Sequence, residues 1–297
     1  MNWLIILLCS IWGFNWVVMN IGGQYFPPMM FSALRFLVGS LVIFAVIWVK
    51  RIPLPKKEDW KWYGICGFLQ IAYVYTASQY AFHYMDTGLV SVLNFTMPLW
   101  LTLISPFFMP DERLTKMKLL GVFTGIIGLV MVMEINPAQF DGNGMKLWME
   151  VFVLLGAVGW AICNIIMKKV LHSHDKIQFT GYQMLIGAIL LLLGSLAFER
   201  GDAITWSREG IFAVLFAGVL ASSLAYVLWF YILSKIDVTK ASMSLLLVPV
   251  VGVFSSALVF QTRLSWSVLI GIVLILAGIG IVNLKQGQRA RSIAVKH

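Results

Sequence analysis

The chain has 297 residues, of which 60% are hydrophobic and only 12% charged, and its mean hydropathy is +0.87. Since a soluble domain would carry about twice that charged fraction, this composition excludes most cytosolic enzymes, nucleic-acid-binding domains and disordered proteins, and it indicates that lipid is the main solvent. The net charge of +9 is typical of a membrane protein with basic cytoplasmic loops, and we expect no nucleic-acid partner.

Apolar windows of about 20 residues, the length that crosses a bilayer as a helix, predict an all-α polytopic membrane protein with ten transmembrane helices. The first window has no basic flank and no small-residue cleavage site, so we interpret it as a retained helix and not as a signal peptide. The predicted helices cover residues 3–21, 29–49, 61–82, 87–109, 117–133, 147–167, 177–198, 210–233, 238–260 and 266–284.

The first two predicted helices contain three candidate substrate-binding residues. Trp12 and Asn15 lie on the first helix, and Arg35 lies in the outer third of the second. A charge at that depth must pair, snorkel to the headgroups or face a polar cavity. Two interpretations stay open: Arg35 is the counter-charge for an anionic group of a substrate, or it snorkels or binds exposed carbonyl groups.

The third predicted helix carries a polar and aromatic stripe. Gln70, Tyr73, Thr76 and Tyr80 are spaced by three or four residues, which places them on one face of an α-helix. Because such a stripe would be unfavourable against lipid, we expect it to face a cavity or another helix. Aromatic walls with few polar groups suit an amphipathic organic solute; simple packing between helices is the alternative.

The fourth and ninth predicted helices each contain a central proline, Pro98 and Pro249. Proline lacks a backbone donor and frees carbonyl groups one turn earlier. Asn94 precedes Pro98 by four residues, and Ser242 lies in the corresponding part of the ninth helix. Paired interruptions predict a binding site or a hinge, although a kink required only for packing is the alternative.

The remaining predicted helices add aromatic residues and glycines. The sixth carries Trp160 and Asn164, and the eighth carries Tyr226 and Trp229; all four are candidate binding residues. Small faces on the fifth and tenth helices predict close helix packing, either within the scaffold or at a homodimer contact. These faces are formed by Gly121, Gly125, Gly128, Gly271, Gly278 and Gly280.

Charged residues predict the orientation and exclude several chemistries. With a cytoplasmic N-terminus, 17 of the 22 lysines and arginines fall on the inner side, so both termini are expected in the cytoplasm of a cell-membrane protein. All 13 acidic residues lie in loops or at helix ends. We therefore expect no enzyme, no cofactor and no metal site, and a facilitator, an exchanger or a proton route through water and tyrosines in place of a carboxylate relay.

The two halves of the chain also resemble each other in sequence. An offset of 151 aligns Tyr80 with Tyr231 and Pro98 with Pro249, and an offset of 148 aligns Trp12 with Trp160. Two repeats of five helices, at 1–140 and 144–285 with a basic tail at 286–297, would be inverted because five is odd. Inverted repeats are frequent in alternating-access transporters; a merely larger bundle is the alternative.

Several segments in order carry a family resemblance: Trp12-Gly13, Ala33-Leu34-Arg35-Phe36, Ser91 through Pro98 to Glu112-Arg113-Leu114-Thr115, and Pro249 with Arg263-Leu264-Ser265. Together they resemble the EamA-type family of the drug/metabolite transporter superfamily over nearly the whole chain. Thr262 departs from the glutamate typical of that family. The resemblance implies ten helices in an inverted arrangement, a central cavity, and export of amino acids and related metabolites.

Three functions therefore compete. The leading hypothesis is a secondary carrier that exports small metabolites such as amino acids, with a small-molecule solute and membrane lipid as partners. The second is a multidrug exporter of hydrophobic compounds. The third, from another class, is a membrane receptor or scaffold without transport, which would bind a solute without moving it.

Overall fold

The computed structural model describes residues 2–108, 115–133, 144–171, 173–235, 245, 247–261 and 264–294. Of these residues 84% are helical and none lies in a strand, which confirms the all-α class. Six helices are long and apolar enough to cross a membrane, and two further apolar helices, Leu247–Phe260 and Trp266–Ile281, are shorter. The six are Trp3–Gly22, Pro28–Val49, Thr87–Phe108, Met145–Lys169, Lys176–Phe198 and Arg208–Trp229.

The helices of the first half of the chain follow the predicted windows closely. Two windows are divided: residues 61–82 form three consecutive segments, and residues 87–109 form two helices separated by a turn. The elements are α1 (Asn2–Gly22), α2 (Pro28–Val49), η1 (Lys57–Asp59), α3 (Trp60–Cys66), η2 (Gly67–Tyr73), α4 (Val74–Ala81), α5 (Thr87–Asn94), α6 (Met97–Phe108) and α7 (Lys116–Met133).

The second half has the same character, and its eighth window, 210–233, is also divided into three segments. Part of the ninth window, including Ser242, lies outside the described residues. The elements are α8 (Met145–Lys169), α9 (Lys176–Phe198), α10 (Arg208–Leu215), η4 (Phe216–Leu224), α11 (Ala225–Lys235), α13 (Leu247–Phe260) and α14 (Trp266–Ala294).

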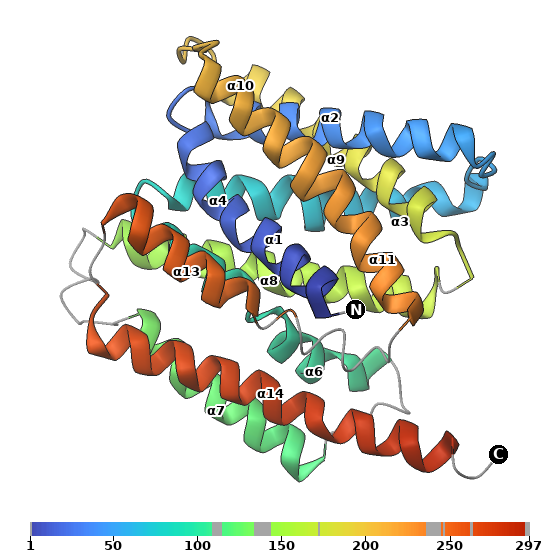
Figure 1. The fold of residues 1–297 in the computed structure, drawn as a ribbon, viewed down its shortest axis with the longest axis vertical. Helices are drawn as coiled ribbons and strands as arrows, with labels where there is room; N and C mark the ends of the chain where they lie inside the picture. Colours follow the sequence, from blue (N-terminus) through green and yellow to red (C-terminus); the bar gives the residue numbers. More distant parts are fainter. Residues whose placement is uncertain are drawn as a thin grey trace.

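Figure 1 shows how these helices are arranged. The pair α2 and α9 lies at one end of the molecule and the pair α7 and α14 at the other, with α1, α8 and α13 between them. The pair α7 and α14 makes contact backbone to backbone. A Cβ atom built on Gly128 would lie 2.5 Å from the carbonyl oxygen of Gly271, and one on Gly278 would lie 2.5 Å from that of Gly121. These glycine faces are therefore used within the chain.

Two segments, η2 and η4, are π-helical. A π-helix forms i→i+5 hydrogen bonds, is rare, and occurs frequently at functional sites. In η4 the hydroxyl groups of Ser222 and Ser223 donate to the carbonyl groups of Ala217 and Gly218, five residues earlier, at 2.8 and 3.0 Å. These serines therefore satisfy carbonyl groups inside the widened turn.

Candidate functional site

Arg35 lies on α2 with a relative exposure of 1%, so it does not snorkel to the headgroups. Its Nη2 donates to Ser222 Oγ at 3.1 Å. Its Nε and Nη1 atoms have no hydrogen-bond partner among the described residues, and no described carboxylate forms an ion pair with it. A buried guanidinium with donors left over is unusual, because buried charges are normally paired.

Aromatic rings surround this guanidinium. Its central carbon lies 4.5 Å from the ring centroid of Phe36 and 4.7 Å from that of Tyr75, and the two rings meet edge to face at 4.6 Å. Tyr226, on α11, also lies close to Arg35. Contacts with aromatic faces stabilise a cation by about 0.5–2 kcal/mol each. They hold the charge in place and leave its donors available.

A second aromatic group continues from the first, across α1 and α11. The Trp12 ring lies 5.5 Å from that of Tyr226 and 6.3 Å from that of Trp229. Its indole Nε1 donates to the carbonyl group of Ala221 at 2.9 Å, next to the serine that binds Arg35. We call this group the Arg35 site; its residues are Trp12, Arg35, Phe36, Tyr75, Ser222, Tyr226 and Trp229.

The structure thus brings together four of the predicted residues: Trp12, Arg35, Tyr226 and Trp229. It also adds three that the sequence reasoning left out of its predicted site. In the sequence Ser222 is one of several ordinary polar residues of the eighth predicted helix. Phe36 and Tyr75 read as ordinary apolar and aromatic positions in their helices. Asn15, three residues after Trp12 on α1, is buried, and its Oδ1 has no hydrogen-bond partner among the described residues.

The stripe predicted on the third helix packs against other helices, which is one of the two arrangements that the sequence left open. Gln70 Oε1 accepts a hydrogen bond from Gln183 at 2.7 Å, on α9. Tyr73 packs on Phe152 of α8, with ring centroids 4.7 Å apart. Tyr80 turns toward the end of α9. The reason is η2, because the wider π-turn breaks the spacing of three and four residues that defines a stripe on an α-helix.

Residues predicted on α8 gather instead at the break between α5 and α6. Trp160 lies 6.1 Å from Phe95, between ring centroids, and the Asn164 amide lies 3.3 Å from the sulfur of Met97. Asn94, at the end of α5, donates to Ser78 Oγ at 3.0 Å, and its Oδ1 has no described partner. These side chains fix the break and lie outside the Arg35 site.

Both predicted prolines lie in the first turn of a helix and not in the middle of a continuous one. Pro98 is the second residue of α6, directly after the turn at Phe95 and Thr96. Pro249 is the third residue of α13 and is buried. The first turn of a helix tolerates proline because its N–H groups have no partner within the helix. Whether either break acts as a hinge stays a prediction.

A buried carboxylate, Glu199, escaped the sequence reasoning because it follows the last residue of α9. It is 6% exposed and accepts three hydrogen bonds: from the backbone N–H of Met29 at 2.8 Å, from that of Met30 at 3.2 Å, and from the Tyr80 hydroxyl at 3.0 Å. It therefore joins the end of α9 to the start of α2 and to α4. Acidic residues are favourable at a helix N-terminus, which was the one available signal.

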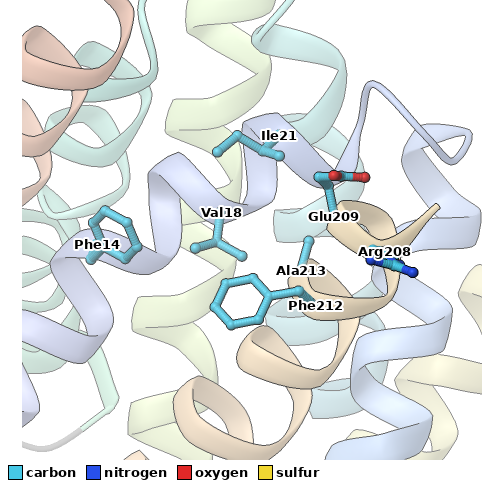
Figure 2. A pocket seen from close by; sticks show the side chains of 7 residues that line it. All are labelled: Phe14, Val18, Ile21, Arg208, Glu209, Phe212 and Ala213. Atoms are coloured by element: carbon cyan, nitrogen blue, oxygen red, sulfur yellow. The ribbon is translucent and has the colours of Figure 1, made fainter.

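A hollow of about 360 Å³ lies away from the Arg35 site, between α1 and α10 (Figure 2). Its lining is mainly apolar and shares no residue with the polar and aromatic Arg35 site. It is lined by Phe14, Val18, Ile21, Arg208, Glu209, Phe212 and Ala213.

Comparison with known proteins decides the family. The profile of the EamA-like transporter family matches residues 1–134 and 147–284. The chain belongs to the EamA-like transporter family. This EamA-like chain is also similar to an "Uncharacterized transporter YoaV" of Bacillus subtilis (strain 168), at 32% identity over 93% of this chain and 94% of that protein.

Other relatives of this EamA-like protein have more informative names. A "Probable amino-acid metabolite efflux pump" of Salmonella typhimurium is 30% identical over 94% of this chain and 93% of that protein. One crystal structure, 19% identical, matches with a TM-score of 0.69 over 95% of this chain and 96% of that chain, a likeness of fold alone. Family and names indicate an integral membrane transporter and not an enzyme.

Proposed function

We propose that this EamA-like protein is a secondary transporter that exports small organic metabolites, amino acids among them, by alternating access. The observation that carries the proposal is the Arg35 site, where a buried cation has free donors and aromatic surroundings. Two relatives, from Salmonella typhimurium and Escherichia coli (strain K12), are named as amino-acid metabolite efflux pumps. Those names concern the relatives, and they agree with the chemistry of the site.

The architecture that we propose is ten transmembrane helices in two inverted five-helix repeats, 1–140 and 144–285. Reciprocal contacts support it. Gly39 of α2 packs against Gly218 of η4, and its counterpart Gly187 of α9 packs against Gly67 of η2. The π-helical segments η2 and η4 also fall at equivalent positions in the two repeats, at the offset of 151. A two-fold relation between the halves accounts for each pairing.

The Arg35 site lies between these two repeats. Trp12, Arg35 and Tyr75 come from the first, while Ser222 and Tyr226 come from the second. Inverted-repeat carriers bind their substrates at such an interface, so that rocking of one repeat on the other exposes the site to each side in turn.

In the proposed complex a carboxylate of the substrate binds the free donors of Arg35. The guanidinium is planar, so two of its N–H groups can bind both carboxylate oxygens, and each charge-assisted hydrogen bond contributes about 1.5–3 kcal/mol. The rings of Trp12, Tyr226 and Trp229 then contact the apolar part of the solute. The repeat counterpart of Arg35 is Gln183, which carries no charge, so only one repeat supplies the anion contact.

Efflux from proteoliposomes loaded with individual amino acids tests this proposal. We expect flux of at least one amino acid, and Arg35→Gln should slow it about tenfold or more, since a single lost charge-assisted bond exceeds 1.4 kcal/mol. Arg35→Lys keeps the charge without the planar fork and should be intermediate. Arg200→Gln, at an exposed arginine two residues after the end of α9, is the matched control.

Three results would contradict it. Wild-type flux in folded Arg35→Gln protein would place the substrate elsewhere. Binding without flux would favour a receptor, and flux of hydrophobic cations alone would favour a multidrug exporter.

We also propose that the protein lies in the cell membrane with both termini on the cytoplasmic side; in Figure 1 the start of α1 and the end of α14 point to the same side. Reporter fusions at each terminus test that orientation.

A further inference from the structure

The hollow between α1 and α10 is an apolar groove with charges at one end (Figure 2). Phe14, Val18 and Ile21 form one wall at a spacing of four and three residues along α1. Phe212 and Ala213 of α10 form the other. Figure 2 shows the ring of Phe212 directed toward the α1 side chains.

The groove is aligned with the depth of the bilayer. Arg208 begins the membrane-length helix Arg208–Trp229, and we infer from this position that its guanidinium lies at the level of the headgroups. Ile21 is the groove residue of α1 nearest to that end, because Gly210 of α10 contacts Tyr25 and Phe26 just beyond α1. From Ile21 to Phe14 the helix rises about 10 Å, so the apolar walls run from the interface into the hydrocarbon region.

Both charges at the mouth are available to a ligand. Arg208 and Glu209 are exposed, and no ion pair or side-chain hydrogen bond joins either to another described residue. They are consecutive on α10 and have opposite signs. A ligand that carries a phosphate, a nearby ammonium group and an apolar chain matches all three parts of the groove.

We propose that this groove binds one phospholipid with an ethanolamine headgroup, its phosphate at Arg208, its ammonium group at Glu209 and one acyl chain between α1 and α10. A water-soluble metabolite is a poor occupant, because most of the walls are carbon and the substrate would lose its hydration without polar partners. A lipid with a net negative headgroup is a weaker match, since Glu209 repels it. This inference does not rest on the transport proposal.

The occupant links the two halves of the chain. Phe14 of α1, at the inner end of the groove, also packs on Phe216 of η4, with ring centroids 5.8 Å apart. An acyl chain in the groove therefore contacts α1, which carries Trp12, and the start of the continuous helix Arg208–Trp229, which further on carries Ser222 and Tyr226 of the Arg35 site.

Native mass spectrometry of the full, delipidated chain tests the proposal. The probes are phosphatidylethanolamine, phosphatidylcholine and phosphatidylglycerol with identical acyl chains, each added in turn. We expect one retained lipid, with phosphatidylethanolamine bound most tightly. Arg208→Gln should weaken binding of all three about fivefold, the equivalent of one basic residue at a membrane surface. Glu209→Gln should remove the preference for ethanolamine over glycerol.

Two further variants test the apolar walls. Ala213→Phe fills the groove and should abolish retention. Because Ala213 is buried, Phe212→Ser is a second test, at a side chain that is 61% exposed, and it should weaken retention without disturbing the fold. Arg200→Gln, at an exposed arginine just after α9, and Leu193→Ser, at an exposed leucine on α9, are the matched controls and should bind as the wild type does.

Equal retention of the three lipids by the wild type would overturn the headgroup assignment. Unchanged retention in Ala213→Phe and Phe212→Ser would overturn the site itself. If these variants alter the ratio of monomer to dimer and leave the bound lipid unchanged, the groove is a contact between copies and the proposal is wrong.

Discussion

Glu199 is predicted to stabilise the end of the molecule where α9 ends and α2 begins, and its replacement by alanine tests that role. The carboxylate accepts the backbone N–H groups of Met29 and Met30 and the Tyr80 hydroxyl, at 2.8, 3.2 and 3.0 Å. Hydrogen bonds to a charged group contribute about 1.5–3 kcal/mol each. The first-turn donors of α2 can regain water, so we expect Glu199→Ala to lower the free energy of unfolding by about 3 kcal/mol in total.

The expected change in melting temperature follows from that figure. At about 2–4 °C per kcal/mol for a chain of this size class, Glu199→Ala should melt about 6–12 °C below the wild type. Glu199→Gln keeps one acceptor oxygen and should lose roughly half as much. A thiol-reactive dye reports unfolding of the purified protein directly, because Cys9, Cys66 and Cys163 are buried thiols that form no disulfide.

A double-mutant cycle separates this role from a general loss of stability. Tyr80→Phe alone removes one hydrogen bond to Glu199 and should lower the stability by about 1.5 kcal/mol. In the Glu199→Ala background it should add nearly nothing, since the partner is already gone. Glu58→Gln, at an exposed glutamate distant in the sequence from Glu199, is the control. An unchanged melting temperature for Glu199→Ala, or full additivity with Tyr80→Phe, would refute the reasoning.

Three further predictions concern packing and the Arg35 site. Gly128→Leu should prevent α7 and α14 from meeting and reduce the yield of folded protein. Gly280→Ala should be tolerated, because nothing lies within 4 Å of its added carbon. Gel filtration after expression compares the yields of folded protein for the two variants. Tyr75→Leu should lower stability or substrate affinity by about 1 kcal/mol. Tyr75→Phe keeps a ring over Arg35 and should lower them by less. Equal effects of the two variants would exclude a contribution of the ring. Gln183→Leu should leave Gln70 without its donor and lower the melting temperature by a few degrees, yet leave the substrate preference unchanged.

The sequence was sufficient to predict the all-α class and the apolar membrane-length helices, and it singled out Arg35. Hydrophobic windows find apolar spans because every backbone group in lipid must be paired within a helix. Arg35 was identifiable because a charge in such a span is rare. Its burial excludes snorkelling to the headgroups, since a snorkelling side chain would be exposed; that it binds an anionic group of a substrate stays a prediction.

The rest of the site could be identified only from the structure. Tyr75 escaped prediction because the stripe on the third helix assumed an unbroken period of 3.6 residues, and η2 interrupts it. Hydropathy windows are insensitive to a π-turn, which changes the direction of side chains and not their polarity. Glu199 was missed for a different reason: a residue just beyond a helix reads as a loop residue until its partners on α2 and α4 are known.

The π-helical segment η2 has a consequence for how this chain can vary in length. A π-turn holds one residue more than the α-turn it replaces, and each residue of an α-helix advances the direction of its side chains by about 100°. Deleting one residue between Gly67 and Tyr73 while the segment relaxes to an ordinary α-helix would therefore leave Tyr75 on the face that meets Arg35. The same relaxation without a deletion would rotate all of α4 by about that angle and take Tyr75 away from Arg35, although no side chain of the site had been altered. The extra residue in this one turn, and not its chemistry, determines which face of α4 the guanidinium meets.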